Sequence, residues 1–353
     1  MSKKLRIGVI GCGGIATWAH MPAYENMDNV EIVAMCDIKI EKAKALAEKH
    51  GVEKVFEDYH DVIALPEVDA IDICTPNKFH SIIAVDALNA GKHVFSEKPD
   101  AVSVEEALKM KEASEKNNKT LMVMRNNRHS APSKFLKKYI EEGNMGEIYA
   151  GRCGWQRTRG IPGKGGWFTT KELSGGGPLI DLGVHMIDLS IWLMGNPTPI
   201  AVSGSTYTKF ADTKISTSRH ARYGEADGEG TFDVEDLAMG FIKFDNGACL
   251  QIEFSWASNI DREKRYVELR GTKSGSTWIN EEVELYGEQS GAYCVTTPQI
   301  KKDIGGHEAN LRHFIDVVLN GAKPDFEPIQ GVNMIKILQA IYKSAETGKE
   351  IEL

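Results

Sequence analysis

The chain has 353 residues, of which 42% are hydrophobic and 26% are charged, a composition typical of globular proteins and unlike that of disordered chains. At about 150 residues per domain, this length predicts two domains, each large enough to bury a core. The formal net charge of −8 argues against a nucleic-acid partner, because binding to phosphate backbones needs clustered positive charge. No apolar stretch approaches the ~20 residues of a membrane span, and no apolar leader follows the N-terminal lysines, so we expect neither a membrane anchor nor a signal peptide.

The cysteines are scattered along the chain without any C-x-x-C spacing. Such cysteines are typical of reduced, mostly buried side chains, so we expect no disulfide framework, no zinc site and a cytoplasmic location. The six residues are Cys12, Cys36, Cys74, Cys153, Cys249 and Cys294.

Short apolar runs alternate with helix-forming segments through the first part of the chain. This alternation predicts a parallel sheet covered by helices on both faces. The expected fold class is therefore α/β, with an N-terminal doubly wound parallel sheet of the Rossmann type over residues 1–127. The expected strands are 5–10, 30–36, 70–74, 93–95 and 121–124, and the expected helices are 41–50, 79–90 and 104–117, with a further helical segment around residues 18–24.

A glycine-rich loop, Gly11-x-Gly13-x-x-Ala16, follows the first expected strand and opens a helix. In this pattern the first glycine makes a tight turn, the second lets the backbone approach a pyrophosphate, and the small third residue lets the helix pack closely. An acid, Asp37, ends the second strand about 20 residues later, where a carboxylate binds the adenosine ribose. The loop and this acid predict NAD rather than NADP as cofactor, although a structural turn beside a solvated Asp37 remains the alternative. The expected loop contacts are Gly11, Gly13, Gly14 and Ile15.

Two polar turns follow later strands of the expected sheet, at the edge where ligands of such sheets bind. Thr75, Pro76, Asn77 and His80 form the first turn, and we expect them at the cofactor, although Asn77 as a helix cap would be equally ordinary. The second turn contains Glu97-Lys98-Pro99. Its Lys98 is a candidate to hydrogen-bond a substrate hydroxyl, and the alternative is a solvated surface charge.

Together, the glycine loop, the Thr75–His80 turn and Glu97-Lys98-Pro99 resemble the Gfo/Idh/MocA oxidoreductases, the relatives of glucose–fructose oxidoreductase and inositol dehydrogenase. The resemblance implies that Lys98 is catalytic and that Glu97 and Lys98 lie at the cofactor. Relatives often carry Gly-x-x-x-Arg after the sixth strand. Here Met124 stands at the glycine position, and the resemblance places Arg128 at the substrate.

A Gly-Gly-Gly-Pro segment opens a second helix of interest, on which Asp181 and His185 are four residues apart and share a face. Histidine is suited to accept a proton near neutral pH, and Asp181 can orient it or bind the substrate. The resemblance adds both to Lys98 as the catalytic set. Asp188 continues the same face, which raises a metal site as an alternative, but no second cluster supplies further ligands and we expect no metal. A buried structural Asp–His pair is the other alternative, and Asp188 is expected to be a cap or a surface charge.

Beyond residue 146 the alternation ends, and hairpin signals such as Asn246-Gly247 predict an antiparallel sheet. The expected second domain, residues 128–353, is α+β and built on this mostly antiparallel sheet. The family resemblance implies that its C-terminal helices pack back on the first domain. A glycine-rich loop suggests Arg157 and Trp167 as substrate contacts, with a hinge and a core aromatic as the alternative. Residues 212–232 form a long polar loop. The expected strands are 148–155, 201–209, 237–244, 248–256 and 265–270, and the expected helices are 307–319 and 332–344.

These observations predict an NAD(H)-dependent oxidoreductase that transfers a hydride between the nicotinamide and a secondary hydroxyl or ketone of a sugar, glycoside or cyclic polyol. One alternative is a glycoside-cleaving enzyme that oxidises C3 transiently with retained NAD. The other is a non-catalytic sugar sensor. The resemblance further implies a homodimer or homotetramer formed through the C-terminal sheet, and we expect no membrane and no nucleic-acid partner.

Overall fold

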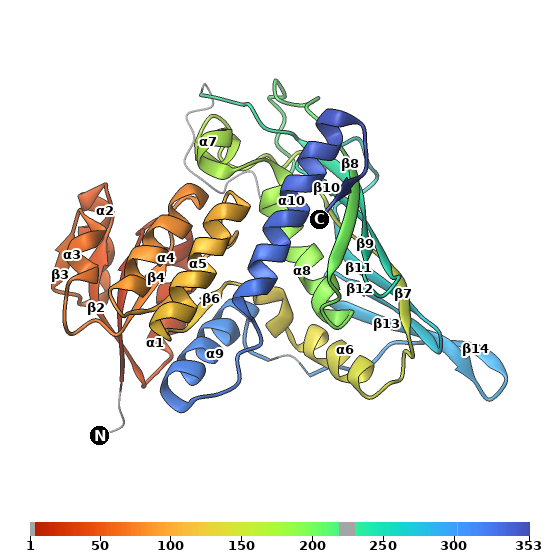
Figure 1. Ribbon diagram of the computed structural model, residues 1–353, viewed down its shortest axis with the longest axis horizontal. Coiled ribbons are helices and arrows are strands. Elements are labelled where there is room, and N and C mark those ends of the chain that lie inside the picture. The colour runs from red at the N-terminus through yellow and green to blue at the C-terminus, as the bar shows by residue number, and fades with distance from the viewer. Residues whose placement is uncertain (1–3, 219–229, 302) are drawn as a thin grey trace. The chain divides into compact units, whose positions relative to one another are not determined.

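The computed structural model describes residues 4–218, 230–301 and 303–353, and the chain divides into two compact units (Figure 1). Unit 1 consists of Met1–Met124 and Gly305–Ile335. Unit 2 consists of Arg125–Ile304 and Lys336–Leu353. Each unit is therefore built from two separate stretches of the chain.

Unit 1 contains a six-stranded, wholly parallel sheet with the strand order β3-β2-β1-β4-β5-β6. This is the order of a Rossmann fold, in which the chain starts in the middle of the sheet and winds outward in both directions. Because the order reverses beside β1, the loops after β1 and β4 diverge and leave room for a ligand between them. The strands are β1 (Leu5–Ile10), β2 (Val30–Cys36), β3 (Lys54–Phe56), β4 (Ala70–Ile73), β5 (His93–Ser96) and β6 (Leu121–Val123).

Local sequence signals account for the ends of the longer helices in unit 1. The hydroxyl of Ser103 accepts the N–H of Glu106 at the start of α5, and Asn118 ends that helix in the left-handed region with φ 50°. Gly51 ends α2 in the same way with φ 68°. The helices and helical turns are η1 (Ala16–His20), α1 (Met21–Glu25), α2 (Ile40–His50), α3 (Tyr59–Ile63), η2 (Asn77–Phe79), α4 (His80–Asn89), α5 (Val104–Asn117) and α9 (Gly306–Asn320), and α10 (Pro328–Thr347) begins in this unit.

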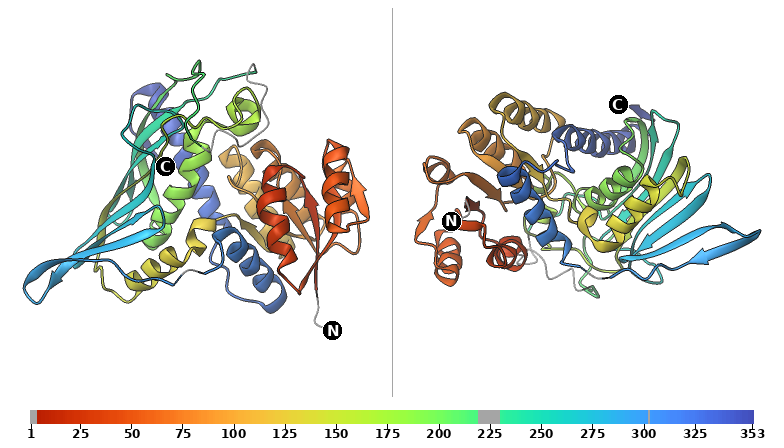
Figure 2. Two further views of the ribbon diagram at one scale, coloured as in Figure 1. Left: turned by 180° about the vertical axis from the view of Figure 1, so that it is seen from behind. Right: turned by 90° about the horizontal axis from the view of Figure 1, so that it is seen from below.

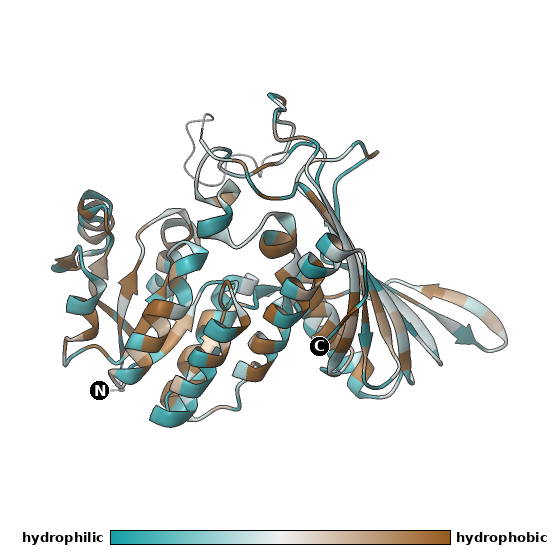
Figure 3. Cartoon of the chain, turned by 45° about the horizontal axis from the view of Figure 1, so that its top comes forward, coloured by the Kyte–Doolittle hydropathy of each residue, from teal (hydrophilic) through white to brown (hydrophobic). Residues whose placement is uncertain are grey.

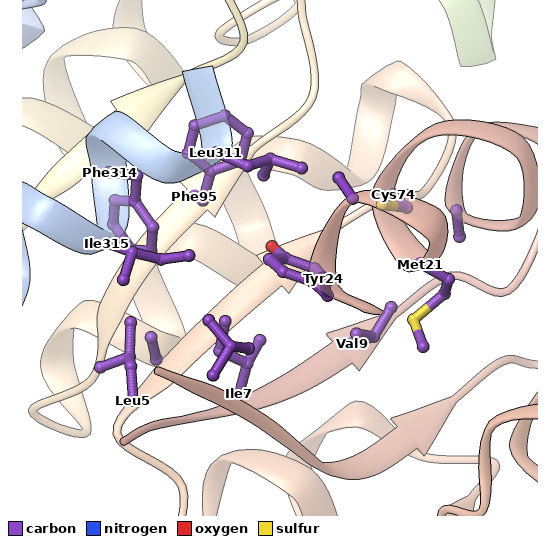
Figure 4. Close-up of a cluster of buried hydrophobic side chains, with 14 of the residues drawn as sticks. Leu5, Ile7, Val9, Met21, Tyr24, Cys74, Phe95, Leu311, Phe314 and Ile315 are labelled. Carbon is purple, nitrogen blue, oxygen red and sulfur yellow. The ribbon is translucent and has the colours of Figure 1, made fainter. Parts of the chain in front are cut away.

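The core of unit 1 lies against one face of its sheet, where Leu5, Ile7 and Val9 of β1 are buried (Figure 4). Helix α9 covers this face, and the ring of its Phe314 lies 5.3 Å from that of Phe95 on β5, centroid to centroid. A helix from the C-terminal part of the chain therefore completes the core of the N-terminal sheet.

Unit 2 contains a nine-stranded sheet with the order β14-β13-β12-β11-β7-β10-β9-β8-β15. All neighbouring strands are antiparallel except β7 and β10, which run parallel. The strands are β7 (Ile148–Gln156), β8 (Pro199–Tyr207), β9 (Leu237–Phe244), β10 (Cys249–Ser255), β11 (Lys264–Gly271), β12 (Ser274–Ile279), β13 (Glu282–Gln289), β14 (Ala292–Thr296) and β15 (Ile351–Glu352).

Tight turns set the register of this sheet. The expected hairpin at Asn246-Gly247 joins β9 to β10, and Gly247 has φ 84°. A second hairpin, between β12 and β13, turns at Asn280 and Glu281, whose φ values of 50° and 72° match a type I′ turn. The sequence did not lead us to expect β12 to β15. For the β12–β13 hairpin the reason is that a non-glycine residue such as Glu281 gives no signal for a left-handed turn.

Helices α6 (Ala131–Glu141) and α8 (Val184–Leu193) lie along one face of this sheet (Figure 2). Along β9 and β10, buried and more exposed residues alternate, so the apolar ones face these helices, and hydrophobic and hydrophilic colours both occur along the strands (Figure 3). The remaining helical segments are η3 (Asn126–His129), η4 (Trp167–Thr169), α7 (Lys171–Ser174) and η5 (Leu179–Gly183).

The expected fold class is confirmed, with a parallel doubly wound sheet in one unit and a mostly antiparallel sheet with helices in the other. Within the described part of the chain, no helix has both the length and the apolar character needed to cross a membrane.

Candidate active site

The glycine loop after β1 has the geometry that its pattern predicts. Gly11 has φ 95°, and a Cβ at this position would lie 2.6 Å from the backbone of Cys74, so only glycine fits. A Cβ at Gly13, in contrast, would meet nothing within 4 Å. The backbone at Gly13 therefore borders open space, which is the position where the fingerprint brings a pyrophosphate close to the chain.

Asp37, at the end of β2, holds this loop. Its Oδ2 accepts the backbone N–H of Cys12 at 2.9 Å, and its Oδ1 accepts that of Lys39 at 2.8 Å. A carboxylate has about four acceptor positions, so both oxygens keep capacity for hydroxyl donors. The side chain is thus placed beside the glycine loop, as its predicted contact with a ribose requires.

The turn after β4 is fixed by the buried ring of His80. Its Nδ1 lies 2.8 Å from the carbonyl oxygen of Pro99, and its Nε2 lies 2.8 Å from that of Thr75. Burial lowers the pKa of this histidine, although both carbonyls favour its charged form. The ring therefore ties two loops together, and this placement supports a structural role for His80 rather than the expected cofactor contact. Asn77 is also buried in this turn, beside Pro76.

The turn after β5 carries Glu97 and Lys98, and the Lys98–Pro99 peptide bond is cis. Glu97 is buried, with Oε1 at 2.9 Å from Nε2 of His20 and Oε2 accepting the Lys98 backbone N–H at 3.1 Å. Burial by itself would raise the pKa of Glu97, but the hydrogen bond and positive charge of His20 lower it to about 2. Both carboxylate oxygens are thus engaged by the protein, which supports an internal role for Glu97 rather than cofactor contact.

These loops follow the strands β2, β1, β4 and β5, which are consecutive neighbours in the sheet. Their carboxyl ends therefore meet along one edge, where doubly wound folds bind their ligands. Besides the open backbone at Gly13, this edge contains the buried Thr75 Oγ1, which has no hydrogen-bond partner among the described residues. An open glycine backbone, a carboxylate at the end of β2 and an unsatisfied hydroxyl together fit a dinucleotide.

The second predicted set lies in unit 2, on a helix that begins with the π-helical segment η5 and continues as α8. Asp181 accepts a hydrogen bond of 2.9 Å from the indole Nε1 of the buried Trp256. One turn later, the ring of His185 lies 5.9 Å from that of Trp155, centroid to centroid. Both side chains are partly exposed, so each keeps surface for a ligand while an indole fixes its position.

A residue that sequence analysis missed holds the start of this helix. The buried carboxylate of Glu235 accepts the N–H groups of Gly177 and Leu179 at 3.0 and 3.1 Å, together with the hydroxyl of Tyr342 at 2.9 Å. Burial raises the pKa of Glu235. A Cβ at Gly177 would lie 2.0 Å from the Glu235 carbonyl oxygen, which explains the glycine there. No local signal could have revealed Glu235, because its partners are distant in sequence.

Asp188, expected as a cap or surface charge, is buried, so this expectation was wrong. Its Oδ2 accepts Arg128 Nε at 2.8 Å, its Oδ1 accepts Arg128 Nη2 at 2.6 Å, and Arg125 Nε lies 2.9 Å from the same Oδ1. Arg128 is only 2% exposed and its guanidinium is bound bidentately, which supports a structural ion pair in place of the expected substrate contact. This pairing also removes Asp188 from the alternative metal site.

The two expected substrate contacts of the glycine-rich loop are also placed. Arg157 is buried, donates to the Gly160 carbonyl at 3.0 Å, and places its guanidinium 5.2 Å from the ring centroid of Trp155. It therefore supports the indole that lies beside His185. Trp167 is half-buried and stacks on Phe168, with 3.8 Å between ring centroids. Of the predicted loop at 212–232, residues 219–229 lie outside the described residues.

Two family models together match nearly the whole chain. Residues 5–125 match "Oxidoreductase family, NAD-binding Rossmann fold", and residues 137–353 match "Oxidoreductase family, C-terminal alpha/beta domain". The chain belongs to the Gfo/Idh/MocA family of oxidoreductases, and its cofactor is NAD. The predicted resemblance, the oxidoreductase class and the predicted cofactor are thus confirmed.

Similar proteins include several that are named dehydrogenases of sugars or polyols. The D-glucoside 3-dehydrogenase of Escherichia coli is 34% identical over 353 residues, covering 100% of this chain and 98% of the relative. The myo-inositol 2-dehydrogenase of Thermotoga maritima is 26% identical and covers 99% of this chain and 98% of the relative. Among solved structures, a levoglucosan dehydrogenase in complex with NADH is 26% identical, has a TM-score of 0.86 and covers 99% of each chain.

Proposed function

We propose that this protein is an NAD(H)-dependent dehydrogenase that oxidises a secondary ring hydroxyl of a sugar, glycoside or cyclic polyol, or reduces the corresponding ketone. A glucoside, oxidised at C3, is the first substrate to test. The observation that carries this choice is the 34% identity to a D-glucoside 3-dehydrogenase over the full length of the chain. We further propose that residues 1–127 bind the cofactor and that residues 128–353 bind substrate and form oligomers.

We assign the chemical roles to Lys98, Asp181 and His185. His185 accepts the proton of the substrate hydroxyl, as a histidine can near neutral pH. The Lys98 side chain hydrogen-bonds the same oxygen and stabilises the developing alkoxide. Asp181, fixed by Trp256, orients the substrate or the histidine. NAD, when bound, supplies the acceptor for the hydride that leaves the carbinol carbon.

The residues that would hold NAD are those at the sheet edge. The backbone from Gly11 to Ile15 would face the phosphates, Asp37 would accept ribose hydroxyls, and Thr75 would offer its unsatisfied hydroxyl. We also propose that Arg157 and Trp167 lie near the substrate. Arg157 would act indirectly, by supporting the Trp155 ring that lies beside His185.

The test is NADH formation, followed by fluorescence, when the protein and NAD are mixed with a panel of glucosides, free sugars and inositols. We expect Lys98→Ala to lower kcat by at least about 100-fold, the usual contribution of one electrostatic or proton-transferring group. The affinity for NAD, measured by calorimetry, should change little. The matched control is Lys116→Ala, which removes an exposed lysine on α5 and should leave kcat unchanged.

The same assay separates the two alternatives. A glycoside-cleaving enzyme that oxidises C3 transiently would release aglycone without net NADH. A sensor would bind sugar and NAD but convert neither. Sustained NADH formation that depends on Lys98 is expected, and either of the other outcomes would contradict the proposal.

We also propose that unit 2 mediates a homodimer or homotetramer. The sheet face away from α6 and α8 carries large exposed apolar side chains, among them Tyr207, Met239 and Phe241 on the neighbouring strands β8 and β9. Such a face is typical of a protein interface. Light scattering should report a dimer or tetramer, and Phe241→Glu should shift it toward the monomer. A monomeric wild type would contradict this assignment.

The proposed location is the cytoplasm, which is supported by the six cysteines. All six are free thiols, and four of them are buried (Cys12, Cys36, Cys74 and Cys153). Free thiols of this kind are typical of reducing compartments. Fractionation of the source cells would test this location.

A further inference from the structure

A chain of buried polar side chains, His20, Asp72 and Glu97, leads to the turn that carries Lys98. His20, on η1 directly after the glycine loop, is fully buried. Its Nδ1 lies 2.8 Å from Oδ2 of Asp72 on β4, and its Nε2 lies 2.9 Å from Oε1 of Glu97. One imidazole therefore bridges two buried carboxylates that come from neighbouring strands.

Both contacts of His20 are satisfied together when both of its ring nitrogens carry protons. Burial by itself would lower the pKa of His20, but the charge of Asp72 raises it well above its usual value. An ionised carboxylate only accepts hydrogen bonds, so each of the two contacts needs an N–H donor on the ring. Asp72 Oδ2 also accepts the hydroxyl of Tyr24 at 3.0 Å, which occupies a further acceptor position. His20 is thus held as an imidazolium, because deprotonation would leave two buried carboxylates with only one N–H between them.

The bridge continues into the backbone of the lysine turn. Glu97 has one oxygen on His20, and its other oxygen accepts the backbone N–H of Lys98 at 3.1 Å. The backbone N–H of Glu97 itself donates to the Ile73 carbonyl at 2.9 Å. Glu97 is therefore fixed both at its backbone and at its carboxylate, and the position of the carboxylate sets the direction of the Lys98 amide.

The other titratable groups around His20 do not compete for its charge. His307, on α9, is neutral because burial lowers its pKa to about 4. The Sγ of Cys74 lies 3.4 Å from Nδ1 of His20. Burial raises the pKa of Cys74 to about 12, so this side chain stays a neutral thiol. Burial also raises the pKa of Tyr24. The charges that face His20 are thus those of Asp72 and Glu97, and the charge of Lys98 acts on Glu97.

The same atoms suggest a metal site, because one ligand atom each of His20, Asp72 and Cys74 lies within 4.8 Å of the others. Two observations argue against it. His20 already uses both nitrogens as donors, so neither has a lone pair for a cation. Cys74 is held as a thiol, which is a poor metal ligand compared with a thiolate. The cluster is therefore better described as an internal ion bridge.

We propose that His20 is a positioning residue for the reaction, which acts through Glu97 to fix the backbone and the direction of the catalytic Lys98. This inference rests on the proposed function for the role of Lys98, but the bridge itself can be tested without it. The bridge also links the glycine-loop helix to the lysine turn, so the elements that hold the cofactor and the catalytic amine share one buried charge network.

The main variant is His20→Gln, whose side-chain amide has two N–H donors but carries no charge. We expect kcat to fall by between about 10- and 100-fold, because a displacement of about 1 Å in a catalytic group has an effect of that order. The KM for substrate and the Kd for NAD should each change by less than about threefold, since binding groups are untouched. Glu97→Gln should give the same pattern, because its single oxygen cannot accept from His20 and from the Lys98 amide together.

The double variant, with Gln at both positions, isolates the mechanism. If His20 acts through Glu97, the double variant loses no more kcat than the worse single variant. The matched control is His50→Gln, which removes another histidine of unit 1 that is paired with a glutamate, Nδ1 lying 2.8 Å from Oε1 of Glu25. We expect this control to keep its kcat.

A second measurement needs neither substrate nor cofactor. Hydrogen exchange at the Lys98 amide, which is protected by Glu97 Oε2, should become faster in His20→Gln and stay unchanged in His50→Gln. Unchanged exchange at Lys98, unchanged kcat, or losses that multiply in the double variant would each overturn the proposal. If His20→Gln does not fold, Glu97→Gln decides by the same two measurements. A wild type that converts no sugar would contradict the proposed function alone, because the exchange experiment would still decide the role of His20.

Discussion

Glu235 offers a demanding test of how unit 2 holds its catalytic helix. This carboxylate is buried and accepts three hydrogen bonds, two from the backbone at the start of η5 and one from Tyr342. The perturbation is Glu235→Ala, which leaves those three donors without an acceptor. Glu235→Gln is the milder variant, because it keeps one oxygen but turns an amide toward a donor.

The magnitude follows from opposing effects. Hydrogen bonds to a charged acceptor contribute about 1.5–3 kcal/mol each. The alanine variant also relieves the cost of burying a carboxylate, which is several kcal/mol. The pKa of Glu235 is raised by burial, which indicates that its hydrogen bonds offset this cost only in part. We therefore expect Glu235→Ala to lower the free energy of unfolding of unit 2 by about 3 kcal/mol, and the melting temperature by about 6–12 °C.

Urea unfolding, followed by the fluorescence of tryptophans such as the buried Trp256 of unit 2, measures this loss. The control is Glu282→Ala, an exposed glutamate on β13. We also expect a lower kcat in Glu235→Ala, since the helix that carries Asp181 and His185 loses its N-terminal anchor. An unfolding midpoint equal to that of the wild type would refute the reasoning.

The pH dependence of the same effect has a definite sign. Because burial raises the pKa of Glu235 above its unfolded value of 4.5, the folded state binds this proton more tightly than the unfolded chain. The stability that the carboxyl contributes is fully present below pH 4.5 and is lost as the pH rises through the raised pKa. The difference in unfolding free energy between wild type and Glu235→Gln should therefore shrink from mildly acidic toward neutral pH. A difference that grows over this range would contradict the assignment.

Three further predictions concern the cofactor loop and the buried ion pair. Asp37→Ser should weaken NAD binding by about 10-fold and strengthen NADP binding, both measured by calorimetry, because the carboxylate that binds the ribose and repels a 2′-phosphate is gone. An unchanged preference for NAD over NADP would argue against the ribose contact. Gly13→Ala should lose NAD affinity yet keep the wild-type melting temperature, whereas Gly11→Ala, with its Cβ 2.6 Å from a neighbouring backbone, should lose stability as well. Arg128→Leu should lower the free energy of unfolding of unit 2, measured with urea, by about 3–5 kcal/mol, because Asp188 keeps a buried charge with fewer partners. A loss below about 1 kcal/mol, which is typical of a surface ion pair, would show that the pair is not buried in solution.

Family membership and fold class were predictable from the sequence because their signals are local. Gly11 has a left-handed backbone conformation and no room for a Cβ, and Gly13 leaves the backbone open for a ligand to approach. Two such constraints in one loop leave a fixed spacing in the sequence. The hairpin at Asn246-Gly247 is another example, since its turn requires residues that tolerate positive φ. The missed hairpin between β12 and β13 turns in part at Glu281, a residue type that gives no signal for positive φ. The next hairpin turns at Ser290-Gly291, a turn dipeptide whose signal was overlooked in the sequence.

The sequence by itself determined which residue types stand at the ends of strands, and so the class of cofactor and the candidate catalytic groups. Only the tertiary structure decided what surrounds each of them. Arg128, Glu97 and His80 look like ligand-binding residues in the sequence, yet folding buries them against Asp188, His20 and two backbone carbonyls. Glu235 and His20 give no local signal, because their hydrogen-bond partners lie far away in the sequence. These partners come together only in the folded chain, where a buried charge without a partner would cost several kcal/mol.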